Sequence, residues 1–313
     1  MQNKMPSHHG VKEKPRPSTE RRGAYPNETV KLLIERASCR SFLDKKIPAD
    51  VLQYILESGI HAATGGNLQP YSIIKIEKQT TKNKLAKLCY QKFIADAPVN
   101  LIFCIDWHRL ERWAKLEIAP FTATSAFRHF WISFQDTMIA AQNICTAADA
   151  MGLGSVYIGT VMEFFPTLKR MLKLPKGVMP VVLLCIGYPR TKLIPRKKLG
   201  IDAVVHNEKY NELSDKKLLD AFNKKYVGMR IEITKERLKR IEKACRDVAG
   251  EKFAKKCIDT VKKQGYISWS QRYFGLHYIA NYMPKGNEKY LKIMEQFGFE
   301  WFKKYRPLKN KAK

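Results

Sequence analysis

Two short polar segments of the sequence combine residue types that can hold a flat, phosphorylated molecule. Arg36-Ala-Ser-Cys-Arg40 places two guanidiniums and a hydroxyl at short spacing, and such groups can bind a phosphate and a nearby carbonyl. Thr64-Gly-Gly-Asn-Leu-Gln-Pro70 is small and polar, so its backbone can approach the edge of a ring. Taken alone, the first segment is more typical of surface arginines beside a helix end, and the second of an ordinary loop.

A third segment, residues 147–159, carries glycines at 152, 154 and 159. The pattern predicts a helix that runs into Gly152, a tight turn, and a short apolar strand that ends at Gly159. Glycine is needed where φ is positive, or where a backbone lies against another group with no side chain between. A bound ligand and a plain helix C-cap before a buried strand both fit this pattern. We expect Gly152 and Gly154 to shape the turn, and Gly159 to leave room for a ligand.

A fourth and weaker segment is Arg196-Lys-Lys198, which is either a further phosphate contact or a solvated charge run. No histidines, cysteines or carboxylates have metal-ligand spacing, so we predict no metal site. The seven cysteines are scattered and form no Cys-x-x-Cys pair. Together with the absence of a secretory signal and of a membrane-spanning apolar run, they predict a cytoplasmic protein that does not contact membranes.

The chain has a formal net charge of +28, from 57 basic and 29 acidic residues. A field of that sign attracts polyanions, which include nucleic acid and phosphorylated small molecules. The aromatic residues are typical of a core rather than of a stacking platform, and no compact RNA-binding motif is present. A solvated basic surface is therefore the favoured interpretation, and nucleic-acid binding stays open as an alternative.

Alternating helical and strand patterns predict an α+β fold with a layered sandwich. We expect strands over residues 71–76, 99–105, 156–158 and 181–186. We expect helices over residues 27–36, 50–59, 85–93, 134–148, 165–172 and 290–302, and a lysine-rich helical pair over 233–263 that breaks at Gly250. Residues 107–131 are rich in aromatic side chains and give no clear assignment.

Taken in order, these segments resemble the FMN-dependent nitroreductase superfamily from about residue 25 to residue 230. The resemblance is closest to the branch of oxygen-insensitive NADPH nitroreductases and NADPH–FMN oxidoreductases. It is carried by the helix Asp136-Thr-Met-Ile-Ala-Ala-Gln-Asn143, by Gly152-Leu-Gly-Ser-Val-Tyr-Ile-Gly159, and by the strand end Leu184-Cys-Ile-Gly-Tyr-Pro189. Phe103-Cys-Ile-Asp-Trp-His108 also resembles the corresponding strand end of the family.

The resemblance implies a central, mostly antiparallel sheet flanked by helices, in an intertwined homodimer that binds FMN at the subunit interface. It implies domains at residues 1–24 (a basic mobile tail), 25–230 (the FMN-binding core) and 231–313 (a lysine-rich helical extension). It implies flavin contacts by Arg36, Ala37, Ser38, Cys39, Arg40, Gln91, Tyr157, Ile158, Gly159, Thr160, Arg196 and Lys198, and by Thr64, Gly65 and Asn67 of the other subunit.

The resemblance also implies the chemistry. Reduction of nitroaromatics, quinones or flavins would follow a ping-pong order, with NADPH or NADH as reductant and with Arg230 assisting its binding. Arg40 would place positive charge near the flavin's pyrimidine edge, and the Gly159 backbone N–H would face flavin N5. No side chain of the protein would act as a nucleophile. Threonine at 160 and lysine at 198 depart from the commoner family residues, which are glycine and arginine.

Two alternatives stay open at this point. One is a more specialised reductase of the same family, such as a dehalogenase or an ene-reductase. The other is a non-catalytic protein derived from the family that binds nucleic acid or an acidic partner through its basic surface.

Overall fold

The computed structural model describes residues 25–306, so the tail predicted over residues 1–24 lies outside the described residues. Contacts divide the chain into two compact units. The first takes the described residues up to Pro195 and from Lys292 onward, and the second is Arg196–Leu291. The predicted domain boundary at residue 230 stays a prediction.

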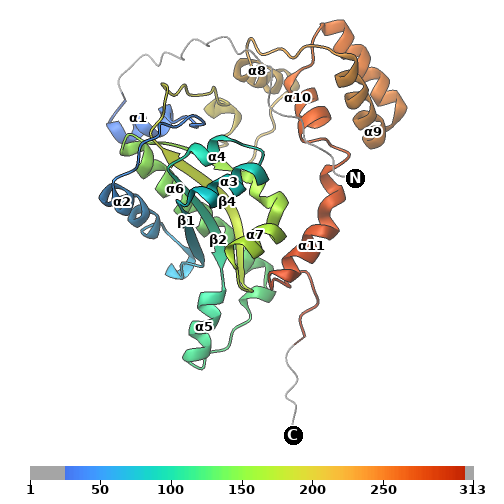
Figure 1. Cartoon of the computed structure of the whole chain (residues 1–313). Coiled ribbons are helices and arrows are strands. Elements are labelled where there is room, and N and C mark those ends of the chain that lie inside the picture. The colour runs from blue at the N-terminus through green and yellow to red at the C-terminus, as the bar shows by residue number, and fades with distance from the viewer. Residues whose placement is uncertain (1–24, 307–313) are drawn as a thin grey trace. The chain divides into compact units, whose positions relative to one another are not determined.

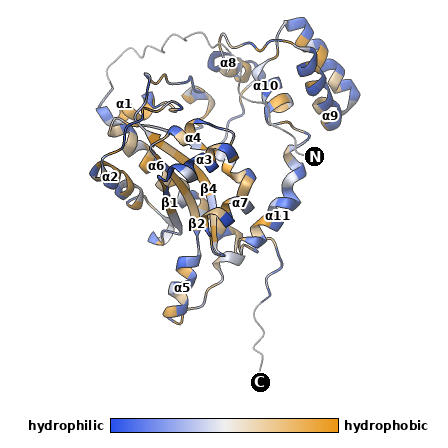
Figure 2. Cartoon of the chain, viewed as in Figure 1, coloured by the Kyte–Doolittle hydropathy of each residue, from blue (hydrophilic) through white to orange (hydrophobic). Residues whose placement is uncertain are grey.

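The first unit is built on one antiparallel sheet with the strand order β1-β2-β4-β3. Its strands are β1 (Tyr71–Ile76), β2 (Val99–Asp106), β3 (Gly154–Ile158) and β4 (Val178–Gly187). Every residue of β2 and β4 is buried, as expected for central strands covered on both faces. Figure 2 shows these strands as mainly hydrophobic, with helices on both sides of the sheet. The predicted α+β fold and antiparallel sheet are confirmed.

The helices of the first unit surround this sheet, except that the helix His108–Leu116 projects away from it (Figure 1). They are α1 (Glu28–Glu35), α2 (Ala49–Ile60), α3 (Gln79–Leu88), α4 (Phe93–Asp96), α5 (His108–Leu116), α6 (Phe127–Ala150) and α7 (Phe165–Leu172), with short 3-10 turns at Gly65–Asn67, Ala123–Ser125 and Gly159–Phe164. The long helix α6 packs against α2 and contacts all four strands. Its buried stripe includes Ala140, Ala141, Ile144, Cys145 and Ala148, which follows the helical spacing seen in the sequence.

Three predicted helices were wrong in their bounds, and one of them, expected over residues 134–148, is α6, which begins at Phe127. The helix expected over residues 85–93 is α3, which ends at Leu88, because Tyr90 takes a left-handed conformation with φ of 55°. The helix expected over 290–302 is α11 (Asn287–Gln296), and the chain then turns at Gly298 with φ of 86°. Residues 107–131, which the sequence pattern did not assign, contain α5 and the start of α6.

The second unit is helical and consists of α8 (Asp215–Lys225), α9 (Lys235–Gln264), α10 (Trp269–Arg272) and the start of α11, with short turns at Ile201–Ala203, Tyr273–His277 and Met283–Gly286. The expected break lies within α9, where Gly250 has φ of 81° and interrupts the helical backbone. The two halves of α9 share an apolar cluster of Ile241, Val261 and Ile267. The prediction that the C-terminal region is helical is therefore confirmed.

Candidate functional site

The segment Arg36 to Arg40 runs beside β3. The backbone N–H of Cys39 donates to the carbonyl of Ser155 at 2.9 Å, and Ser38 pairs with Ser155 as an isolated parallel bridge. An extended backbone alternates its side chains, so Ala37 and Cys39 are buried while Ser38 and Arg40 are exposed on the opposite side. Ser38 and Arg40 can reach a ligand with their side chains, whereas Ala37 and Cys39 can offer only backbone.

The Arg36 side chain turns toward the interior. Its Nε lies 3.2 Å from Cys145 Sγ, its Nη2 donates to Ser155 Oγ at 3.2 Å, and its guanidinium lies 6.0 Å from the centre of the Tyr157 ring. Arg36 also forms an ion pair with Asp149, with 3.3 Å between Nε and Oδ2. These contacts tie the start of the segment to α6 and β3.

Asp149 is a charged residue beside the site that the sequence pattern did not reveal. Its Oδ2 is buried and accepts no hydrogen bond within the described residues, although the Arg36 charge lies beside it. Burial raises the pKa of the Asp149 carboxyl from 3.8 to about 6, and the Arg36 charge opposes that rise. The feature of the sequence that could have revealed Asp149 is the position of this acid one helical turn after Cys145, in an otherwise apolar stretch.

We expect Asp149→Asn to remove a pH dependence of stability. The folded carboxyl holds its proton more tightly than the unfolded one, so its contribution is most favourable below about pH 4 and is lost as the pH rises through about 6. The free energy of unfolding of the wild type should therefore fall, relative to that of the variant, between about pH 4 and 7. Urea denaturation of both proteins at both ends of this range measures the difference between their free energies of unfolding. A difference that does not change with pH would contradict the prediction.

The loop at residues 64–67 is anchored by α6. Both carboxylate oxygens of Asp136 lie 3.2 Å from the backbone nitrogen of Gly65, which donates to them. Burial raises the pKa of Asp136, and this N–H opposes the rise. Thr64 Oγ1 accepts from the backbone N–H of Gln69, and Asn67 takes φ of 56°. The loop therefore has a fixed shape, with Gly65 and Asn67 exposed.

The end of β3 brings further predicted residues together. Gln91, in the loop after α3, donates from Nε2 to Thr160 Oγ1 at 3.2 Å. The Tyr157 hydroxyl donates to Gln142 Oε1 at 3.4 Å, and burial raises the pKa of Tyr157. Ile158 is buried and Gly159 is exposed. Arg36 thus contacts Ser155 and Tyr157 within β3, and Gln91 contacts Thr160 just beyond its end.

The three glycines of this segment differ in what requires them. Gly152 has φ of 73°, which disfavours any side chain. A Cβ on Gly154 would lie 2.6 Å from Cys39 Cβ, so the segment at Arg36–Arg40 can approach β3 only beside a glycine. A Cβ on Gly159 would meet only the end of Met162, at 3.8 Å. Nothing in the described chain requires glycine at 159, so a requirement for glycine there would have to come from a bound ligand.

Three predicted residues belong to the second unit. Arg196 and Lys198 are exposed and lie outside its helices. The Arg230 guanidinium lies over the Tyr266 ring, 5.0 Å from its centre. The assignment of these three side chains to the flavin and the reductant stays a prediction.

Comparison with known proteins shows the family to which the chain belongs. The family model described as "Nitroreductase family" matches residues 33–188. An oxygen-insensitive NADPH nitroreductase of Salmonella typhimurium is 31% identical over 191 residues, which cover 61% of this chain and 78% of that protein. An FMN reductase (NADPH) of Bacillus subtilis is 29% identical, over 60% of this chain and 77% of that protein.

A solved structure, that of NfrA2 from B. megaterium, has a similar fold. Its TM-score is 0.67 at 26% identity, and the match covers 88% of this chain and all of that one. The chain belongs to the nitroreductase family, and with that family it is an oxidoreductase. In the part of the chain that the structure describes, no helix is long and apolar enough to cross a bilayer.

Proposed function

We propose that the protein is an FMN-dependent NAD(P)H oxidoreductase. The observation that carries this proposal is the line of contacts along β3 and past its end, where Arg36 lies 6.0 Å from the centre of the Tyr157 ring, Gln91 donates to Thr160, and a Cβ on Gly159 would meet only Met162. Three segments far apart in the sequence thus lie along this strand, and Gly159 after its end presents no side chain. The names of the relatives support FMN and NADPH as the molecules concerned.

The chain's own residues would bind and orient the cofactor. When bound, FMN supplies the hydride chemistry between NAD(P)H and an electron acceptor. Ser38 and Arg40 project to the exposed side of their segment, where they can bind phosphate, ribityl or carbonyl oxygens. The positive charge of Arg40 would favour negative charge that develops at a nearby ring edge. Gly159 would offer its backbone N–H without a side chain in the way.

We propose that NADPH and the acceptor occupy the same place in turn, in a ping-pong order. Nitroaromatics, quinones and flavins are flat molecules that such an open place would accept. Arg230 is exposed and would meet the 2′-phosphate that NADPH carries and NADH lacks, which favours NADPH.

We also propose a homodimer, because one chain leaves apolar surface uncovered. The helix α1 has no buried residue, although Leu33 and Ile34 form an apolar face and are 52% and 39% exposed. On α6, Trp131 is 52% exposed and lies beside Phe134. Exposed apolar patches of this kind mark interaction surfaces. Light scattering should give twice the chain mass of 36.2 kDa, and a monomer would contradict the proposal.

Initial rates test the proposed order. With FMN-loaded protein and varied NADPH at several fixed concentrations of a quinone, double-reciprocal plots should give parallel lines, because reductant and acceptor never bind together. Intersecting lines would contradict a shared binding place. Replacing the quinone by a nitroaromatic compound should leave the pattern unchanged.

A further inference from the structure

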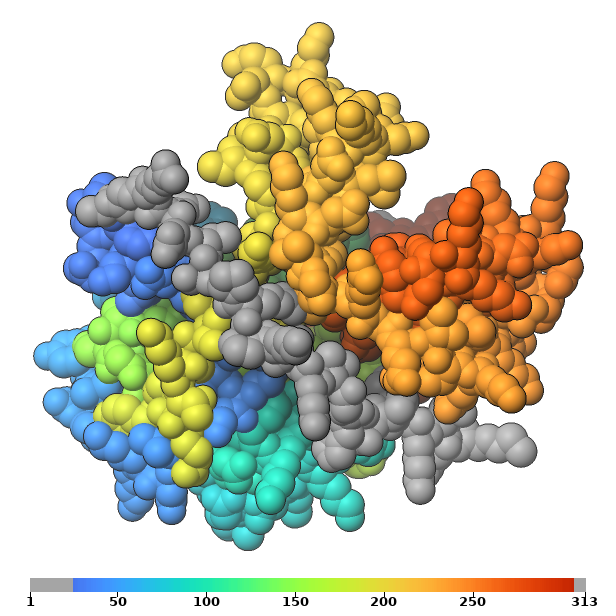
Figure 3. Space-filling model, turned by 90° about the horizontal axis from the view of Figure 1, so that it is seen from above, coloured from blue at the N-terminus to red at the C-terminus, as the bar shows by residue number. Residues whose placement is uncertain are grey.

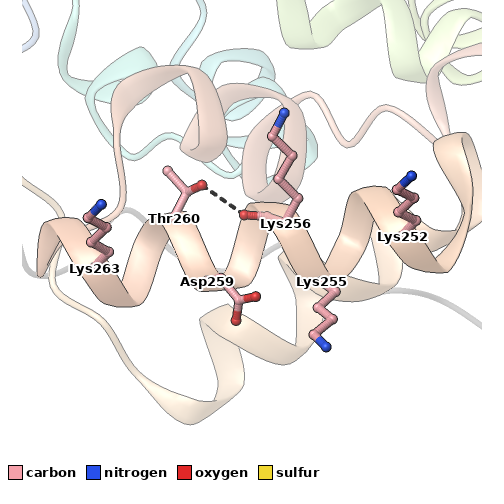
Figure 4. Close-up of a pocket in the computed structure, with 6 residues that line it drawn as sticks. All are labelled: Lys252, Lys255, Lys256, Asp259, Thr260 and Lys263. Atoms are coloured by element: carbon pink, nitrogen blue, oxygen red, sulfur yellow. Dashed lines mark hydrogen bonds between the residues drawn. The ribbon is translucent and has the colours of Figure 1, made fainter.

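The second half of α9 carries five exposed lysines: Lys252, Lys255, Lys256, Lys262 and Lys263. We name this set the lysine cluster. Four of them, together with Asp259 and Thr260, line an open pocket of about 340 Å³. Figure 4 shows the ammonium groups of Lys252 and Lys256 on one side of the helix and that of Lys255 on the other. Orange side chains from this part of the chain project from the surface in Figure 3.

The two halves of α9 differ in how their charges are paired. In the first half, Lys243 binds Asp247 at 3.2 Å, and Arg246 binds Glu242 at 3.0 Å. Arg246 also pairs with Glu251, which directly precedes the cluster in sequence. Among the described residues, by contrast, no carboxylate lies within ion-pair distance of any lysine of the cluster. Its positive charges are therefore not neutralised by ion pairs within the described chain.

Unpaired like charges at this spacing repel one another. Lys252 and Lys256 are four residues apart on a helix, a spacing at which like charges destabilise by about 0.2–0.5 kcal/mol. An anion with several charges that lies along the helix would relieve this repulsion. Along a rise of 1.5 Å per residue, Lys252 and Lys263 are about 16 Å apart, which about five phosphates of one duplex strand would span.

The rest of α9 favours nucleic acid over other polyanionic partners. The apolar side of this half is already used within the unit, since Ala254 and Val261 are buried and Ile258 packs on the shared cluster. A helix that lies in a membrane surface needs that side free. Lysine is depleted in the cores of protein–protein interfaces, so an acidic protein is also a poorer fit. Lysines bind phosphates as point charges and need no planar partner.

We propose that the lysine cluster binds the phosphodiester backbone of nucleic acid without reading its sequence. Phe253, which follows Lys252 in the sequence, is 52% exposed, so a base of a single strand could stack on it. Duplex and single-stranded nucleic acid both present a row of phosphates, and the experiment compares the binding of these two forms. This binding is separate from the proposed flavin chemistry.

Fluorescence anisotropy of the full-length protein tests the proposal. The probes are a labelled duplex of about 20 base pairs and a single strand of the same length, each titrated between about 50 and 200 mM salt. The test variant replaces all five lysines of the cluster with glutamine, which keeps the stems and removes the charges. The matched control replaces five other exposed lysines of the same unit with glutamine, so that the two variants have the same net charge. These are Lys209, Lys216, Lys217, Lys224 and Lys289.

The wild type should bind, with a log–log salt slope of about −3 or steeper. The cluster variant should bind at least about tenfold more weakly, and its slope should be smaller by about one for each phosphate that it no longer neutralises. The control should bind less than about threefold more weakly than the wild type. Circular dichroism and flavin content should match in all three proteins. Tighter single-strand binding that Phe253→Ala removes would identify the single strand as the source.

Three results would overturn the proposal. Equally weakened binding in the cluster variant and the control would show that binding depends on the overall positive charge of the protein and not on the lysine cluster. No binding by the wild type at about 50 mM salt would exclude a nucleic-acid site. Cluster-dependent binding to phosphatidylserine vesicles, without binding to either nucleic acid, would assign the surface to a membrane.

Discussion

Arg40→Ala should weaken FMN binding by about tenfold to a hundredfold, and should slow reduction of the remaining flavin by NADPH. Arg40 is exposed beside Ser38, on the side of its segment that faces away from the buried Ala37 and Cys39. Hydrogen bonds to a charged group contribute about 1.5–3 kcal/mol, which gives this range. The loss of positive charge also removes electrostatic support for negative charge at the ring edge.

The control for this variant is Lys262→Ala, an exposed lysine of the second unit. It should leave flavin content and the rate of reduction unchanged. Flavin absorbance after dialysis measures binding, and stopped-flow mixing with NADPH measures reduction. Equal and small effects in the two variants would refute the assignment of Arg40 to the flavin site.

Gly154→Ala should destabilise the fold, while Gly159→Ala should not. A Cβ at 154 would lie 2.6 Å from Cys39 Cβ and 3.0 Å from Cys39 Sγ, and overpacking of this kind costs about 1–3 kcal/mol. A Cβ at 159 makes only an ordinary contact with Met162, so the free energy of unfolding should stay within about 0.5 kcal/mol of wild type. Urea denaturation of the two flavin-free variants measures this contrast.

When flavin content is measured instead of stability, the substitution at 159 should have the larger effect. Gly159→Val should fold with near-normal stability and bind little FMN, because its side chain would fill the space left for the ring. The double variant Gly154→Ala, Cys39→Gly should recover part of the stability lost by Gly154→Ala, because it removes the opposing atoms. Full flavin content in Gly159→Val would contradict the division between structural and functional glycines.

The sheet could be predicted from the sequence because its strands are short, apolar and bounded by turn residues. The strand β1 was predicted with its observed bounds, directly after Pro70. Continuous apolar runs predict central strands. The strand β4 tolerates Pro180 because its register with β2 is irregular at this point, between Phe103 and Cys104. The structure requires glycine at 152 and 154, as the sequence pattern predicted, and the role of Gly159 beside a ligand stays a prediction.

The errors have physical causes that a single sequence conceals. Helix α3 ends where Tyr90 adopts the left-handed conformation, a position at which glycine would have signalled the end. Beyond α11, the buried Phe297 and Phe299 continue an apolar pattern that resembles a helix although the backbone turns at Gly298. The ion pair of Arg36 with Asp149 joins residues far apart in the chain, so no local pattern reveals it.

Anaerobic mixing of the purified protein with NADPH tests the central claim most directly. The proposal predicts a protein that carries visible flavin absorbance, alone or after FMN is added, and that loses this absorbance on mixing with NADPH, faster than with NADH. Subsequent addition of a quinone should restore it. A protein that gains no visible absorbance with FMN, or whose bound flavin neither reductant bleaches, would contradict the assignment of the β3 end as a flavin site.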